Sequence, residues 1–179
     1  SKVRMKTYAS FYDIVEGVKE ETGITNLVNR YNEFIRLIVR AERDINPYAG
    51  HFLQKKIKYK NGFGNFNGTS IKVPDDFISL IGIYDRIEVG RMPLEIRDNT
   101  SHILLCNGQI NPTAVLSYWA SQLDPQGFPF VPYTHFEAVV AFICWKIYSQ
   151  KTFMGDGNAN LKIHFQENYE RFARAARGF

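Results

Sequence analysis

The sequence of 179 residues contains only two cysteines, Cys106 and Cys144, which lie far apart and form no zinc-finger pattern with the histidines. A disulfide framework and a structural zinc site are therefore not expected, and a reducing, cytosolic folding environment fits best. A folded chain of this length buries about 70% of the surface that its unfolded form exposes. Its core can therefore supply stability without cross-links or metals.

Long apolar runs are also absent. The longest strongly apolar stretch, residues 136–147, is too short to span a bilayer and contains Glu137 and Lys146. The N-terminal residues are basic, but Asp13 interrupts the region in which an export signal would carry an unbroken apolar core. We therefore expect no membrane-spanning helix and no export signal.

Catalytic and ligand-binding motifs are scarce. No nucleophile elbow or cysteine-protease signature occurs, and the glycines of residues 62–68 do not have the spacing of a dinucleotide-binding fingerprint. Asp75 and Asp76 have no third carboxylate nearby in sequence to complete a cation site. The four histidines fall in four different predicted elements: His51, His102, His135 and His164. We predict no catalytic residue, no cofactor and no metal.

The net charge of +4 is spread unevenly along the chain. Residues 1–60 carry +5, residues 61–130 carry −3 and residues 131–179 carry +2. No zinc-finger, basic-zipper or ribonucleoprotein motif accompanies the basic ends. Sequence-specific DNA binding is therefore not expected.

Helical patterns occupy both ends of the chain. Ser10 and Asp13 form a capping box for a first helix that ends near Gly23, and a second helix is predicted from about Thr25 to the Asn46–Pro47 pair. After a proline-rich bend, residues 136–147 are apolar on most of a helical circumference, which predicts a buried core helix. A last helix is predicted from about residue 158.

The middle of the chain has the alternation of β-strands. Residues 54–60 and 71–73 flank a turn rich in glycine and asparagine, which predicts a β-hairpin with a flexible tip. Further strands are predicted at residues 80–84, 86–89, 94–97, 102–106 and 113–119. The predicted class is α+β, in which a helical bundle of residues 1–50 and 125–179 holds an inserted antiparallel β-sheet region at 51–124.

Two groups of side chains are candidate protein-interface residues. Phe63 and Phe66 lie in the predicted hairpin tip, and aromatic rings in an exposed loop are typical of a contact with another molecule. We expect this loop to order against a neighbouring subunit or a tail protein. Arg171, Arg174 and Arg177 either match the dipole at the end of the last helix or form a cationic patch for a partner.

Three segments, in the same order, resemble the head-to-tail connector (adaptor) proteins of tailed bacteriophages. Residues 71–84 read Ile-Lys-Val-Pro-Asp-Asp-Phe-Ile-Ser-Leu-Ile-Gly-Ile-Tyr and are similar to the proline, aspartate, aspartate, phenylalanine segment that precedes a strand of the family's inserted sheet. Residues 37–47 resemble the family's early helix. Residues 116–138 are similar to its last strand, bend and long buried helix. The similarity is greatest to the adaptors of short-tailed phages, including the crAss-like group.

The resemblance implies a virion structural protein without catalytic activity. It implies an about dodecameric ring below the portal protein, which extends the channel for double-stranded DNA and provides a docking platform for tail or further ring proteins. The location implied is the head-tail junction of the virion, with host cytoplasm during assembly. Members often have a long C-terminal arm along the portal, whereas this sequence ends at Phe179 soon after its last predicted helix. The mode of portal attachment is thus left open.

Two alternatives remain. The first alternative to the adaptor function is a lower ring or tail-completion protein that does not touch the portal. The second is an enzyme acting on a small substrate in the cytosol. The second alternative has no catalytic constellation to support it. Pull-down against portal and tail proteins separates the first alternative from the adaptor function.

Overall fold

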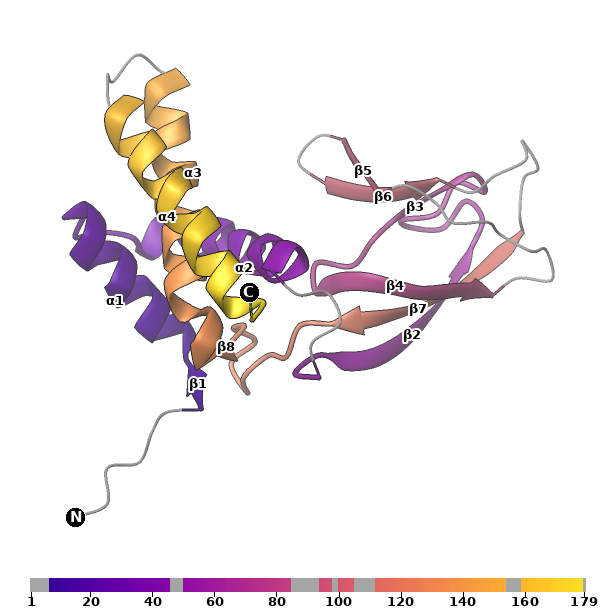
Figure 1. The fold of residues 1–179 in the computed structure, drawn as a ribbon. Helices are drawn as coiled ribbons and strands as arrows, with labels where there is room; N and C mark the ends of the chain where they lie inside the picture. Colours follow the sequence, from indigo (N-terminus) through magenta and orange to yellow (C-terminus); the bar gives the residue numbers. More distant parts are fainter. Residues whose placement is uncertain are drawn as a thin grey trace. The chain divides into compact units, whose positions relative to one another are not determined.

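The computed structural model of the protein describes residues 7–45, 50–84, 94–97, 100–104, 112–153 and 159–178. In these ranges it has four α-helices and small antiparallel sheets, so the predicted α+β class is confirmed (Figure 1). The chain divides into two compact units. The helical unit comprises Ser1–His51 and Ser121–Phe179, and the sheet unit comprises Phe52–Ala120. The predicted strand at 86–89 and Cys106 lie outside the described residues.

The elements of the helical unit come from both ends of the chain. They are β1 (Tyr8–Ala9), α1 (Phe11–Thr22), the 3-10 turn η1 (Val28–Arg30), α2 (Tyr31–Ile45), β8 (Val131–Pro132), the 3-10 turn η2 (Tyr133–His135), α3 (Phe136–Phe153) and α4 (Ala159–Ala176). The short strands β1 and β8 pair antiparallel. None of the helices that the structure describes has the length and apolarity needed to cross a membrane.

The first helix begins and ends as predicted. The backbone N–H of Asp13 donates to the Ser10 hydroxyl, and the backbone N–H of Ser10 donates to the Asp13 carboxylate. Gly23 follows the helix with a φ of 71°, a left-handed conformation that glycine adopts without strain. The capping box and the glycine stop are both confirmed.

The second helix begins later than predicted. Thr25 precedes it in an irregular segment, which leads through η1 into α2 at Tyr31. Leu27 is buried with a non-helical backbone, at φ −113° and ψ 0°. Burial of this side chain fixes the segment before the helix, so the helical spacing of the apolar residues there does not produce an α-helix.

The core of the helical unit is organised around α3. This helix contacts the other three, and Figure 1 shows it beside α4 along much of its length. Buried residues occur around most of its circumference, as predicted. A Cβ atom at Gly17 of α1 would lie 2.9 Å from the Val140 side chain of α3. Glycine therefore permits the close approach of these two helices.

The described residues of the sheet unit form two three-stranded antiparallel sheets. The first has the order β2 (Leu53–Lys60), β7 (Thr113–Ala120), β4 (Phe77–Tyr84). The second has the order β3 (Ser70–Lys72), β6 (Thr100–Leu104), β5 (Leu94–Arg97). Their shared core consists of buried apolar residues that include Tyr118, Leu116, Ile71 and Ile103.

The predicted hairpin between residues 54–60 and 71–73 is wrong. Strand β2 pairs along its whole length with β7, from Leu53 opposite Ala120 to Lys60 opposite Thr113. Strand β3 pairs with β6 in the other sheet. Alternation in a sequence identifies a strand and its buried face, but it does not identify which strand pairs with it.

Candidate interaction surfaces

The glycine-rich loop contains one exposed and one buried aromatic ring. Phe63 is 72% exposed, whereas Phe66 is only 2% exposed. Phe66 forms an isolated β-bridge with Ile71, and its ring lies 6.4 Å from that of Tyr59. The expectation that both rings are exposed is therefore wrong for Phe66, because the loop folds back and buries this ring in the core of the sheet unit. Phe63 is the ring that remains accessible to another molecule.

The three C-terminal arginines have different surroundings. Arg177 donates from Nε to the Ile45 carbonyl oxygen at 2.9 Å and from a terminal nitrogen to the Asp44 carbonyl oxygen at 2.7 Å. It thereby binds the last carbonyl groups of α2 and holds the ends of α2 and α4 together. Arg171 lies over the Phe172 ring at 4.9 Å, and Arg174 is exposed. Arg177 therefore has a structural role, while Arg171 and Arg174 are available to a partner.

Asp76 is a polar anchor in the sheet unit. The Tyr118 hydroxyl donates to one of its carboxylate oxygens at 3.0 Å, and Lys55 Nζ donates to the other at 2.6 Å. Burial raises the pKa of Tyr118, and the Asp76 charge and hydrogen bond raise it further. These contacts connect β2, β7 and the turn before β4. The neighbouring Asp75 is exposed.

His135 and His51 both have polar partners within the helical unit. His135 Nδ1 lies 2.9 Å from Glu42 Oε1, and both side chains are almost completely buried. His51 Nε2 donates to the Phe130 carbonyl oxygen at 3.1 Å. Burial lowers the pKa of His51, which favours its neutral form. Among the described residues, no group of three or more histidine, cysteine or acidic side chains has an arrangement that could hold a metal ion.

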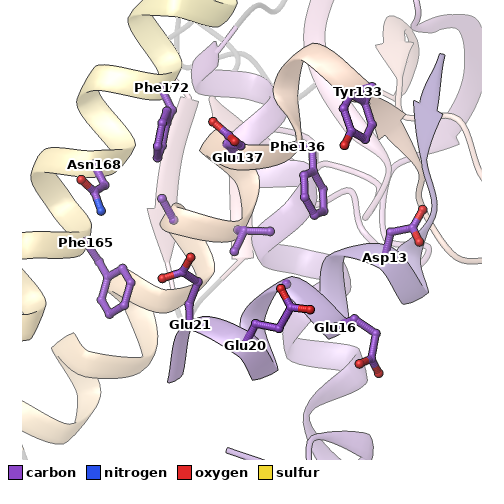
Figure 2. Close-up of a pocket in the computed structure, with 13 residues that line it drawn as sticks. Asp13, Glu16, Glu20, Glu21, Tyr133, Phe136, Glu137, Phe165, Asn168 and Phe172 are labelled. Carbon is purple, nitrogen blue, oxygen red and sulfur yellow. The ribbon is translucent and has the colours of Figure 1, made fainter. Parts of the chain in front are cut away.

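A groove of about 410 Å³ lies among α1, η2, α3 and α4 of the helical unit. Aromatic rings form much of its apolar surface: Tyr133, Phe136, Phe165 and Phe172. Five carboxylates also line it: Asp13, Glu16, Glu20, Glu21 and Glu137. Figure 2 shows these rings and carboxylates around the same hollow.

The groove is strongly acidic, because five carboxylates line it and none of the described residues around it is a lysine, an arginine or a histidine. Glu16 has a nearby cation, Lys19 Nζ at 3.2 Å, but this ion pair is on the surface and contributes little. An apolar floor beside the carboxylates of Glu20, Glu21 and Glu137 suits a partner that presents both a cation and a flat apolar side chain. The geometry therefore favours a protein contact over a site for a phosphate or a nucleic acid.

Our sequence interpretation did not identify this acidic groove, although one signal was present. The acidic residues Asp13, Glu16 and Glu20 recur at steps of three and four, which places them on one face of the first helix. The aromatic residues that complete the groove come from η2, α3 and α4, more than 100 positions further along the chain. Only the packing of these helices creates the hollow.

No family model matches this sequence, and the comparison with curated proteins finds no match.

Proposed function

We propose that this protein is a virion structural protein, a head-to-tail connector (adaptor) that forms an oligomeric ring below the portal protein. The ring extends the channel through which double-stranded DNA passes, and its lower face provides a docking platform for tail proteins. The observation that carries the proposal is the order of the three segments that resemble this family. The positions of those segments in the fold support it.

Each resembling segment lies in the type of element that the family resemblance implies. Residues 37–45 belong to α2, the early helix of the helical unit. Residues 71–84 run from β3 through a turn, in which the Phe77 N–H donates to the Pro74 carbonyl oxygen at 3.1 Å, into β4. Residues 116–118 lie in β7, and residues 136–138 begin the buried helix α3.

The division of the chain also supports an adaptor. The chain leaves the helical unit after His51, forms the sheet unit, and returns at Ser121. A ring subunit needs lateral faces for its neighbours and further faces for the proteins above and below it. The acidic groove of the helical unit and the exposed Phe63 of the sheet unit are two candidate faces that do not share residues.

The test is electron microscopy of negatively stained samples that contain the purified protein, alone and mixed with the portal protein of the same genome. We expect rings of this protein, or an additional collar on the portal. Monodisperse monomers together with bare portals would contradict the adaptor function. Pull-down with tail proteins then tests the alternative of a lower ring or tail-completion protein, which binds tail components but not the portal.

A further inference from the structure

A second charged surface of the helical unit complements the acidic groove. Lys146 Nζ lies 3.8 Å from the centre of the Trp145 ring and 5.1 Å from that of Phe142. Arg40 of α2 lies over the same Phe142 ring at 5.9 Å. We call Arg40, Phe142, Trp145, Lys146 and the nearby Lys162 of α4 the basic-aromatic patch.

The charges of Arg40 and Lys162 both act on Lys146 in the basic-aromatic patch. Burial lowers the pKa of Lys146, and the charges of Arg40 and Lys162 lower it further against the opposing charge of Asp44. None of the three cations forms an ion pair with another residue in the part of the chain that the structure describes. Adjacent positive charges repel each other, so an anionic partner would stabilise this surface.

The basic-aromatic patch and the acidic groove use opposite faces of α3. Successive residues of an α-helix are turned by about 100° around its axis. The groove residues Phe136, Glu137, Val140 and Ala141 occupy one face of α3. The mean direction of Phe142 and Lys146 around the helix axis differs from that of the groove residues by about half a turn. A contact between these two surfaces of one molecule is therefore impossible, but a contact between two copies is not.

We propose that the acidic groove of one copy binds the basic-aromatic patch of the next copy. The inference rests on the proposed ring and identifies its lateral interface. A contact between two different surfaces of identical subunits is head-to-tail, and such a contact closes into a ring when the rotation between subunits permits. The groove carboxylates would face the three cations, and the partly exposed Trp145 ring would meet the aromatic floor of the groove, while Phe142, only 6% exposed, supports the cations from the core.

Two other occupants are less favoured by these observations. DNA phosphates would satisfy the patch cations, but they would leave the acidic groove without a partner. A basic segment of another protein would satisfy the groove, but it would leave the patch exposed. A second copy of this chain satisfies both surfaces with the same contact, and for this reason we choose it.

Charge reversal on three exposed residues and the partly exposed Lys162 tests the contact. The groove variant carries Glu20→Lys and Glu137→Lys, and the patch variant carries Arg40→Glu and Lys162→Glu. Lys146 is left unchanged because it is half-buried against Trp145. The matched control carries Lys58→Glu and Lys60→Glu on exposed positions of β2. Circular dichroism and urea unfolding check that each variant is folded.

Sedimentation velocity measures self-association over a range of protein and salt concentrations. We expect the wild type and the control to associate, and each reversed variant alone to associate at least about tenfold more weakly, because like charges then face each other. An equimolar mixture of the two variants should recover association, since the reversed groove of one complements the reversed patch of the other. Added salt should weaken association of the wild type.

Several results would overturn this inference. One is a groove variant that associates as strongly as the wild type. Another is an equimolar mixture of the two variants that does not recover self-association. A third is a wild-type protein that stays monomeric at all concentrations. A patch variant that loses only DNA binding would reassign the patch to nucleic acid. Formation of a collar on the portal is measured in the separate microscopy experiment. The results on self-association therefore do not decide whether the protein is an adaptor.

Discussion

The Nδ1 atom of His135 lies 2.9 Å from Oε1 of Glu42 inside the core of the helical unit. The two side chains have exposed fractions of 4% and 1%. The second carboxylate oxygen of Glu42 has no hydrogen-bonding partner among the described residues. The pair joins the last turn of α2 to η2, which directly precedes α3. Among the described residues, the Glu42 side chain therefore depends on His135 as its hydrogen-bonding partner.

Removal of one member of this pair should destabilise the protein strongly. We expect His135→Leu to lower the free energy of unfolding by about 3–5 kcal/mol, because the buried Glu42 carboxylate then has no partner. The double variant His135→Leu with Glu42→Leu should recover much of this loss, since apolar side chains often replace a buried pair at little cost. Urea unfolding measures all three proteins. A double variant as unstable as the single one would contradict this explanation.

Asp76 should contribute to the stability of the sheet unit, whereas Asp75 should not. We expect Asp76→Ala to lower the free energy of unfolding by about 1–3 kcal/mol, because the Tyr118 hydroxyl loses its acceptor. Asp75→Ala at the adjacent exposed position should change it very little. Equal effects of the two substitutions in urea unfolding would show that the cross-strand contacts of Asp76 are not the cause.

Arg177 should stabilise the helical unit, whereas Arg174 should not. Arg177→Ala removes two hydrogen bonds to the last carbonyl groups of α2, and we expect a loss of about 1 kcal/mol because the guanidinium is partly exposed. Arg174→Ala, one turn earlier, should leave thermal unfolding unchanged. If Arg174→Ala weakens ring formation without an effect on stability, the residue belongs to an interface, which is one of the two interpretations that the sequence leaves open.

Phe63 should act in assembly and Phe66 in folding. Phe63→Ser should leave the free energy of unfolding unchanged, because the ring is exposed, and should reduce the formation of rings or portal collars. Phe66→Ser should destabilise the protein by about 3 kcal/mol or more, because it removes a buried ring from the core of the sheet unit. Normal assembly of a folded Phe63→Ser protein would exclude this ring as a contact.

Cys144 should be unreactive in the folded protein. Burial, together with the charge of Glu21, raises the pKa of its thiol to about 12. Thiol reagents attack the thiolate, so the native protein in a Cys106→Ser background should react hardly at all at pH 8 and faster only as the pH approaches 12 or as urea unfolds it. Rapid labelling of the native protein at pH 8 would contradict the burial of Cys144.

Much of the fold could be predicted from local sequence patterns. The Ser10 and Asp13 capping box needs only residues three positions apart, and the apolar run at residues 136–147 predicts the buried helix α3, although the helix continues to Phe153. The pairing of the strands could not be predicted in this way. Strand β2 pairs with β7, more than 50 residues away, and no local pattern encodes the identity of this partner.

The candidate surfaces also combine features that the sequence determines with features that only the tertiary structure decides. The sequence by itself determined the α+β class, the acidic stripe on α1 and the aromatic residues of the loop after β2. Tertiary structure decided that Phe66 is buried while Phe63 is exposed, that Arg177 caps α2, and that the acidic stripe faces aromatic rings from α3 and α4. The physical reason is the separation in sequence over which the interactions act. Helix caps and periodicity depend on residues a few positions apart, whereas burial, ion pairs and grooves depend on packing between segments far apart in the chain.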